Sequence, residues 1–166
     1  MTGVEICGYI PGAIGKITEL HATYYSKYWG FGLFFESKVA TGMCEFLNRF
    51  KEAHDGFWVA AVQGQIVGSI TIDGVKSELD GAHLRWFIVD PACQGQGIGN
   101  RLIQEAVDFC KKMHFSRVYL WTFQGLDPAR HLYEKHGFRL VKEHEGTQWG
   151  LAVKEQMYEL TLNYAF

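Results

Sequence analysis

Residues 82–100 read AHLRWFIVDPACQGQGIGN. The first eight residues are mostly apolar or aromatic, which predicts a strand that stops before the Asp90-Pro91 pair, because proline cannot donate a hydrogen bond to a sheet. Three alternating glycines follow, and apolar residues then recur at helical spacing over 98–110. The stretch therefore predicts a strand, a glycine-rich turn and a long amphipathic helix.

The glycine-rich turn has the properties of an anion site. Glycine lets the backbone approach a ligand closely, and the first amide N–H groups of a helix have no partner within that helix. These amides and the helix dipole together favour a phosphate group. A pyrophosphate ligand is therefore predicted at this turn; the alternative is a turn that only joins the strand to the helix.

Two common nucleotide sites do not fit this turn. The G-x-G-x-x-G pattern of dinucleotide-binding folds needs glycine at a position that Asn100 occupies. The loop of nucleoside triphosphatases needs Gly-Lys followed by Ser or Thr, but the Gly15-Lys16 pair is followed by Ile17. A nicotinamide-dependent reductase and a nucleoside triphosphatase are therefore disfavoured.

Hydrophobic periodicity predicts one mixed α/β domain over residues 1–166, in the order β-αα-β-β-β-α-β-α-β-β. The sheet is expected to be antiparallel at hairpins and parallel across the helical crossovers. Gln63-Gly64 predicts a tight hairpin turn, and the aromatic residues and glycines of 28–35 predict a loop. Strands are expected at 4–10, 57–62, 65–72, 82–89, 117–123, 138–144 and 156–162, and helices at 13–29, 39–50, 98–110 and 127–136.

The composition is typical of a soluble globular protein. The chain has 166 residues, is 48% hydrophobic, and has 16 Lys+Arg against 18 Asp+Glu, so no nucleic-acid partner is predicted. No apolar run approaches the roughly 20 residues that cross a bilayer, and no secretory signal is visible, so no membrane partner is predicted and a cytoplasmic location is expected. The four cysteines and seven histidines lack metal-ligand spacing, so no metal is predicted.

Two motifs resemble those of a known family. The Q-x-x-G-x-G pattern of residues 94–99 is similar to the pyrophosphate loop of the GNAT (GCN5-related) N-acetyltransferases, which bind acetyl-CoA. Residues 129–138, ARHLYEKHGF, resemble the A-x-x-L-Y-x-x-x-G-F signature of that family. Residues 8–35 and 84–133 look particularly like the acetyltransferase half of bacterial MarR-GNAT fusion proteins. The order of elements extends the resemblance over the whole chain.

The resemblance implies where acetyl-CoA, the co-substrate, would bind. In the family, the strand at 82–89 carries a bulge and splays from its parallel neighbour at 117–123, and the pantetheine arm lies in the gap. The backbone of this strand is expected to pair with the pantetheine amides, and the Val89 amide to polarise the thioester carbonyl. The expected acetyl-CoA contacts are Phe87, Ile88, Val89, Gln94, Gly95, Gln96, Gly97, Ile98, Gly99 and Asn100.

The resemblance also implies an acetyl transfer. A neutral primary amine of a small molecule or peptide would attack the acetyl carbon directly, through a tetrahedral intermediate that releases CoA thiolate. Tyr133 matches the tyrosine that protonates the thiolate in many relatives; the alternative is that Tyr133 only packs on its helix. His83 stands where some relatives carry a glutamate base, or is a strand histidine with satisfied hydrogen bonds. Relatives often have asparagine where this chain has Leu126.

The acceptor pocket of this family is lined by the first two helices, their connection and the loop between the last strands. Aromatic side chains there could stack an aromatic acceptor or enclose an alkylammonium, or could instead form core or a homodimer surface. Arg85 could attract an acidic group of the acceptor or pair with a nearby carboxylate. The competing function is a non-catalytic acyl-CoA-binding regulatory module. The expected acceptor contacts are Arg85, Trp29, Phe31, Phe34 and Trp149, in a wider aromatic set with Tyr25, Tyr28 and Phe35.

Overall fold

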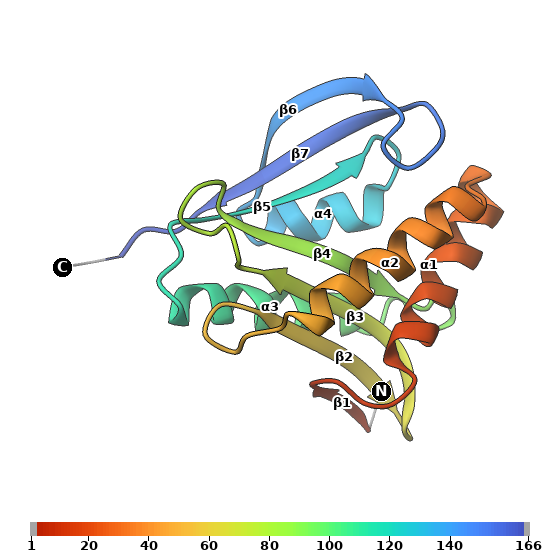
Figure 1. Cartoon of the computed structure of the whole chain (residues 1–166), viewed down its shortest axis with the longest axis horizontal. Helices are drawn as coiled ribbons and strands as arrows, with labels where there is room; N and C mark the ends of the chain where they lie inside the picture. The colour runs from red at the N-terminus through yellow and green to blue at the C-terminus, as the bar shows by residue number, and fades with distance from the viewer. Residues whose placement is uncertain (1–2, 165–166) are drawn as a thin grey trace.

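The computed structural model describes residues 3–164. Within that range the strands form one seven-stranded sheet in the order β1-β2-β3-β4-β5-β7-β6 (Figure 1). β4 and β5 are parallel, and the other neighbours are antiparallel. The predicted α/β order is confirmed. The elements are β1 (Val4–Cys7), α1 (Ala13–Trp29), α2 (Leu33–Asn48), β2 (Gly56–Val62), β3 (Gln65–Asp73), β4 (Ala82–Val89), α3 (Ile98–Lys112), β5 (Arg117–Phe123), α4 (Asp127–Lys135), β6 (Arg139–Gly146) and β7 (Val153–Thr161).

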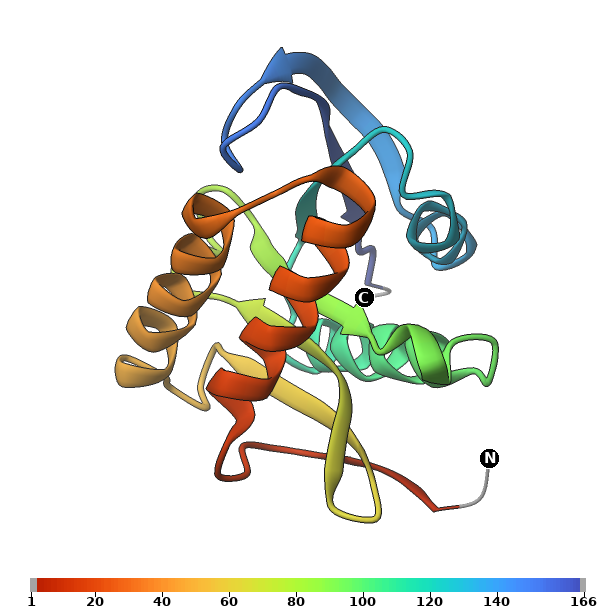
Figure 2. The ribbon, with the colours of Figure 1, turned by 90° about the vertical axis from the view of Figure 1, so that its right-hand side faces the viewer.

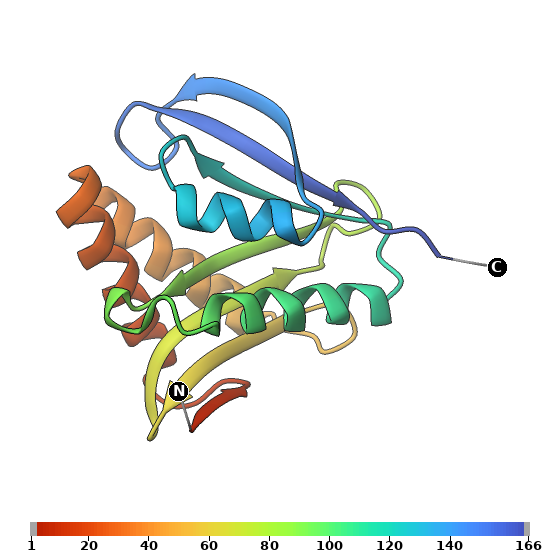
Figure 3. The ribbon, with the colours of Figure 1, turned by 180° about the vertical axis from the view of Figure 1, so that it is seen from behind.

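The helices cover both faces of the sheet and create two apolar cores. The hairpin of α1 and α2 lies on one face (Figure 2), and α3 and α4 lie on the other (Figure 3). Ile17, Met43 and Phe46 are fully buried in the first core, and Leu102 and Ile103 in the second. Each such side chain contributes about 1.5–3 kcal/mol of hydrophobic stabilisation. No helix within residues 3–164 is both long and apolar enough to cross a bilayer.

The predicted hairpin turn is confirmed. Gln63 and Gly64 have φ of 50° and 78°, which is the left-handed geometry that a tight two-residue turn needs at both positions. This turn joins β2 to β3, and β4 lies next to β3 at the centre of the sheet.

The prediction of an aromatic loop over residues 28–35 is wrong. α1 and α2 extend into this stretch and leave only residues 30–32 between them. Gly30 ends α1 with φ of 73°, its N–H donating to carbonyls of the last turn, and Gly32 begins α2. The glycines therefore act as helix ends instead of as parts of a long loop. As a consequence, Phe35 lies on a helix and packs into the core.

β4 carries a bulge and diverges from β5. Trp86 has φ of 47°, and the register between β3 and β4 shifts at this point. The buried Ser69 hydroxyl donates to the Trp86 carbonyl at 2.6 Å and holds the bulge. In the described part of the chain β4 pairs with β5 at two positions, the second being His83 with Tyr119, and the strands then separate (Figure 1). The expected bulge and split are therefore present.

Candidate functional site

A cavity of about 360 Å³, here called the turn cavity, lies beside the part of β4 that has separated from β5. Its lining comes from β4, the glycine-rich turn and the start of α3, and it is completed by side chains of α1 and α4. Gln96 is exposed and does not line it. The structure brings these predicted acetyl-CoA residues together in the turn cavity: Phe87, Ile88, Val89, Gln94, Gly95, Gly97, Ile98, Gly99 and Asn100.

The glycines of the turn leave the start of α3 accessible. Gly95 and Gly97 have φ of +80° and +81°, and a Cβ at either position would meet no heavy atom within 4 Å. Gly97 caps α3 without a side-chain hydrogen bond, and the first turn has no acidic residue. Gly99 has another role, because a Cβ there would lie 3.0 Å from Leu132 Cδ1 of α4. The first amides of α3 therefore face open space at the positive end of the helix dipole.

Asn100 connects α3 to α4 at the edge of the turn cavity. The ring Nε2 of His136 and the side-chain Oδ1 of Asn100 lie 2.9 Å apart in a hydrogen bond. Burial, followed by the charge of Lys135, lowers the pKa of His136. The residue that breaks the dinucleotide motif thus helps to position the helix that carries Tyr133.

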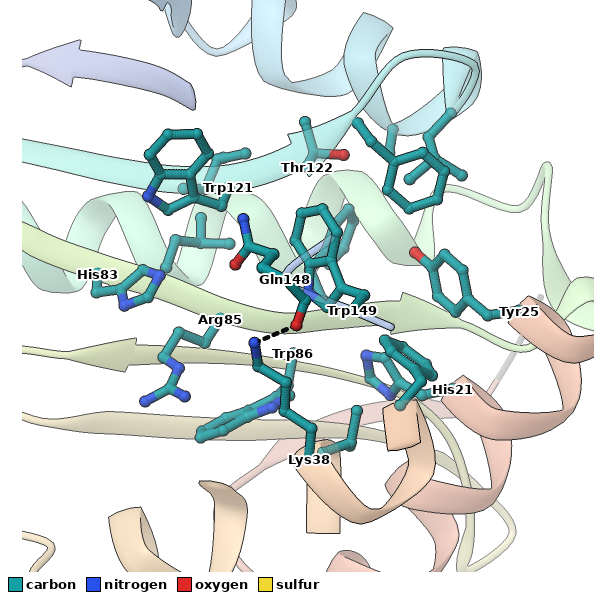
Figure 4. Close-up of a pocket in the computed structure, with 18 of the residues that line it drawn as sticks. His21, Tyr25, Lys38, His83, Arg85, Trp86, Trp121, Thr122, Gln148 and Trp149 are labelled. Atoms are coloured by element: carbon teal, nitrogen blue, oxygen red, sulfur yellow. Dashed lines mark hydrogen bonds between the residues drawn. The ribbon is translucent and has the colours of Figure 1, made fainter. Parts of the chain in front are cut away.

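A second cavity of about 190 Å³, here called the aromatic cavity, is lined by both β4 and β5 and lies in the split. Tyr25, Phe87, Leu126 and Ala129 line both cavities and join them. His83, Arg85 and Trp121 lie at one end of the view in Figure 4, and Tyr25 and His21 at the other. Leu126, which stands where relatives often have asparagine, is therefore an apolar part of the junction. The other lining residues are Phe35, Lys38, Val39, Leu84, Trp86, Leu120, Thr122, Phe123, Tyr133, Gln148 and Trp149.

Tyr133 lines the aromatic cavity from α4, with 6% of its surface exposed. Its ring lies 5.9 Å from the Phe87 ring, measured between centroids, and also packs near Phe138 and Tyr158. Burial raises the pKa of Tyr133, and the nearby Tyr25 adds to this effect. The phenol is therefore protonated at neutral pH, so it is a proton donor close to the junction of the cavities.

His83 lies on β4 at the closed end of the split. Its ring stacks on the Tyr119 ring with 4.5 Å between centroids. Burial, followed by the positive charge of Arg85, lowers the pKa of His83 to about 3. The imidazole is thus neutral at neutral pH and can accept a hydrogen bond, but a general base works best with a pKa near the working pH. Its role as base stays a prediction.

Arg85 belongs to a charge cluster beside the aromatic cavity. Its Nη1 lies 3.2 Å from Asp73 Oδ2, and its guanidinium lies 4.1 Å from the centroid of the Trp86 ring. The same Asp73 oxygen binds Arg49 Nη2 at 2.6 Å. Arg85 therefore pairs with a nearby carboxylate, which is one of the two roles that the sequence suggests for it. One carboxylate oxygen thus binds two guanidinium groups, and Asp55 and Glu45 also act on Arg49.

The predicted acceptor aromatics divide between cavity, core and surface. Trp149 lines the aromatic cavity. Trp29 packs edge-on against Phe123 at 4.8 Å between centroids, and Phe31 is a core residue with 2% exposure. Phe34 has 61% of its surface exposed at the start of α2. The short connection between α1 and α2 turns Phe31 inward, which explains this placement. Two further members of the predicted aromatic set line the aromatic cavity: Tyr25 and Phe35.

A hydrogen bond that no sequence motif marks links α2 to the β6–β7 loop. Lys38 Nζ donates to the Gln148 carbonyl at 2.6 Å, across 110 positions in the chain (Figure 4). The backbone and side-chain amides of Gln148 donate to the buried Glu155 carboxylate at 3.0 and 2.8 Å. This chain of contacts holds Trp149 over the cavity. No local pattern in the sequence reveals a pairing of this kind.

His21 is a second polar residue of the aromatic cavity that sequence analysis does not identify. Its Nδ1 lies 2.8 Å from the Ile17 carbonyl, which fixes Nδ1 as the donor and leaves Nε2 as an acceptor. Burial lowers the pKa of His21 to about 4. A helical stripe through Ile17, His21 and Tyr25 is the signal that could have placed it on the inner face of α1. Among residues 3–164 no group of three His, Cys, Asp or Glu side chains is suited to a metal ion.

Residues 14–138 match the Acetyltransferase (GNAT) family. This match covers most of the chain and includes the glycine-rich turn and the helix that carries Tyr133. The chain belongs to the GNAT acetyltransferase family. Acetyl-CoA is the acyl donor of this family.

This GNAT chain has recognisable relatives. It is 30% identical over 119 residues to an uncharacterized N-acetyltransferase of Methanocaldococcus jannaschii, covering 69% of this chain and 53% of the relative. It is 36% identical over 89 residues to N-acetylaspartate synthetase of Danio rerio, covering 54% and 31%. The chain thus matches about half or less of the length of these relatives. A Salmonella typhimurium protein described as an acetyltransferase with its cofactor acetyl-CoA has the same fold, with a TM-score of 0.76, 16% identity and coverage of 99% and 96%.

Proposed function

We propose that this GNAT chain is an N-acetyltransferase that moves an acetyl group from acetyl-CoA to a primary amine of a small molecule or peptide. The observation that carries the proposal is that two neighbouring cavities at the β4–β5 split share four lining residues. One end presents helix amides suited to a diphosphate, and the other holds a buried phenol among aromatic walls. A domain that only bound the cofactor would have no need of the second cavity.

The residues of the turn cavity fit acetyl-CoA, which supplies the acetyl group as a thioester. The open space around Gly95 and Gly97 admits a diphosphate to the amides of α3. Beyond His83 the backbone of β4 has no β5 partner, so it can hydrogen-bond the amides of the pantetheine arm. The amide of Val89 would polarise the thioester carbonyl.

The aromatic cavity would hold the acceptor amine beside the thioester. The amine nitrogen attacks the acetyl carbon, so an N–C bond forms and the C–S bond breaks; the amine loses one proton and the sulfur gains one. Tyr133 is the candidate donor of the proton to sulfur because it lines the aromatic cavity near the residues that the two cavities share; burial raises its pKa and so makes it a weak acid. His83 is the candidate acceptor of the amine proton, and its low pKa makes it a weak base.

Release of free thiol from acetyl-CoA tests this function against the alternative of a non-catalytic acyl-CoA-binding module. Amines, polyamines, amino acids and peptides are supplied one at a time, and binding is followed by thermal shift with acetyl-CoA, CoA, NADH and ATP. We expect the first two ligands alone to raise the melting temperature, and at least one amine to give thiol release. Binding without turnover over the whole panel would favour the regulatory module.

We also propose a cytoplasmic location. The structure shows no disulfide among the described residues, and the four cysteines Cys7, Cys44, Cys93 and Cys110 are free. Free cysteines are typical of a reducing compartment. Fractionation of cells expressing the chain, with the thiol-release assay on each fraction, tests this location.

A further inference from the structure

The aromatic cavity has a positive charge that is unexpected for an amine site. Lys38 and Arg85 line the cavity, and among residues 3–164 no Asp or Glu side chain does so. A protonated amine that entered would face charges of its own sign in a partly desolvated space, and juxtaposed like charges are unfavourable. An amine acceptor with no other charge is therefore poorly matched to this lining.

The carboxylates nearest to the cavity already have partners. Asp73 binds Arg49 at 2.6 Å and Arg85 at 3.2 Å. Glu155, whose charge acts on Lys38, is buried, accepts two hydrogen bonds from Gln148 and lies 3.2 Å from His144 Nε2.

Lys38 itself is held by a neutral group. Its ammonium donates a hydrogen bond to the Gln148 carbonyl. In Figure 4 the Lys38 side chain extends from α2 between Arg85 and His21. Burial and the charge of Arg85 lower the pKa of Lys38, whereas the charge of Glu155 opposes them. An ammonium has three N–H donors, so two remain after the bond to Gln148.

We propose that the acceptor is an amine that also carries a carboxylate, of the class of α-amino acids with an apolar or aromatic side chain, and that Lys38 binds this carboxylate. The inference rests on the proposed function and names the acceptor class for it. Trp86, Trp121 and Trp149 supply the apolar walls for the acceptor side chain. The volume of about 190 Å³ suits a compact acceptor, since sites for drug-sized ligands occupy roughly 300–1,000 Å³.

The charge pattern also favours entry of the acceptor. The acceptor carboxylate offsets the charge of Lys38 and Arg85. A carboxylate near Arg85 also opposes the charge of that arginine, which lowers the pKa of His83. Polyamines and other acceptors with two positive charges are excluded by the same pattern.

The test compares amino acids with their amides, which keep the amine and the side chain but lack the carboxylate. Thiol release is measured for leucine, methionine, phenylalanine and tryptophan and for the amide of each. For wild type we expect at least one acid to have a higher kcat/KM than its amide. Lys38→Gln keeps a donor for the Gln148 carbonyl but removes the charge. In this variant the acid-to-amide ratio, which is kcat/KM for the acid divided by kcat/KM for its amide, should fall about 10- to 100-fold, mainly through KM.

Two further variants separate recognition from folding. Lys38→Arg should keep most of the acid preference, because it restores the charge. Lys112→Met, at an exposed lysine in the last turn of α3, should leave the ratio unchanged. Acetyl-CoA affinity, measured by calorimetry, should be the same in all variants and shows that each one folds.

Three results would overturn the inference. One is that every amide is used as well as its acid. Another is that Lys38→Gln keeps the wild-type ratio. The third is that polyamines or simple alkylamines give thiol release but no amino acid does. That result would contradict the acceptor class but would still support the proposed N-acetyltransferase activity. Retained acetyl-CoA binding without turnover of any amine would contradict the proposed function itself, and the inference with it.

Discussion

Tyr133 and Tyr158 are neighbouring buried tyrosines whose side chains line different cavities. Because Tyr133 is the proposed proton donor to sulfur, Tyr133→Phe should lower kcat about 100-fold or more. The affinity for acetyl-CoA should change little, since the lost hydroxyl lines the aromatic cavity and not the turn cavity. Tyr158→Phe is the matched control, and kcat should stay near wild type. If kcat falls by the same factor in the two variants, Tyr133 has a packing role only.

The buried histidines predict how stability depends on pH. The pKa of His21 is lowered to about 4 and that of His83 to about 3, mainly by burial, against about 6.5 in an unfolded chain. Between these values the unfolded state binds more protons, so the free energy of unfolding falls as pH is lowered from 6.5 toward 4. Each histidine contributes up to about 1.4 kcal/mol per pH unit.

Denaturant unfolding at a series of pH values measures this slope. His21→Gln should flatten it, whereas His131→Gln, at an exposed position of α4, should leave it unchanged. A wild-type stability that is constant over this range would show that the two imidazoles are not buried in the neutral form.

At the scale of elements, the start of α3 is the feature on which donor binding depends. Gly97→Asp should raise the Kd for CoA at least about 100-fold, because it places a carboxylate beside the helix amides that bind the diphosphate. Gly97→Ala is the matched variant, since alanine at φ of +81° is strained at least as much as aspartate while it adds no charge. Its Kd should rise much less. An unchanged Kd for Gly97→Asp, by calorimetry, would contradict this placement of the diphosphate.

The elements themselves could largely be predicted, because strand and helix periods are local properties of the sequence. The glycine-rich turn and the order of elements were predictable for this reason. The prediction of a loop at residues 28–35 is wrong, because Gly30 ends α1 and Gly32 begins α2. Glycine permits both conformations, so tertiary packing decides between them.

The residues of the aromatic cavity were harder to predict than those of the turn. The turn is continuous in sequence, so its ligand-facing residues follow from the motif. The contact between Lys38 and Gln148 joins distant segments, and only the folded chain shows it. The core position of Phe31 likewise depends on the length of the connection between α1 and α2, which aromatic composition does not encode.

At the scale of the whole molecule, the sheet is assembled from two parts that meet at a short parallel pairing. β1 to β4 lie on one side of the split and β5 to β7 on the other. The aromatic cavity takes Lys38 and His21 from the helices of the first part and Gln148 and Trp149 from the loop of the second. Closure of the split would therefore remove the space for the donor and the acceptor.

A crystal structure of the chain with acetyl-CoA tests the central claim most directly. The account predicts the diphosphate within hydrogen-bonding distance of the first amides of α3, and the pantetheine arm along β4 in the split. The thioester should lie where the two cavities join, beside Tyr133. A complex in which the coenzyme binds elsewhere, with β4 and β5 paired along their full length, would contradict the account.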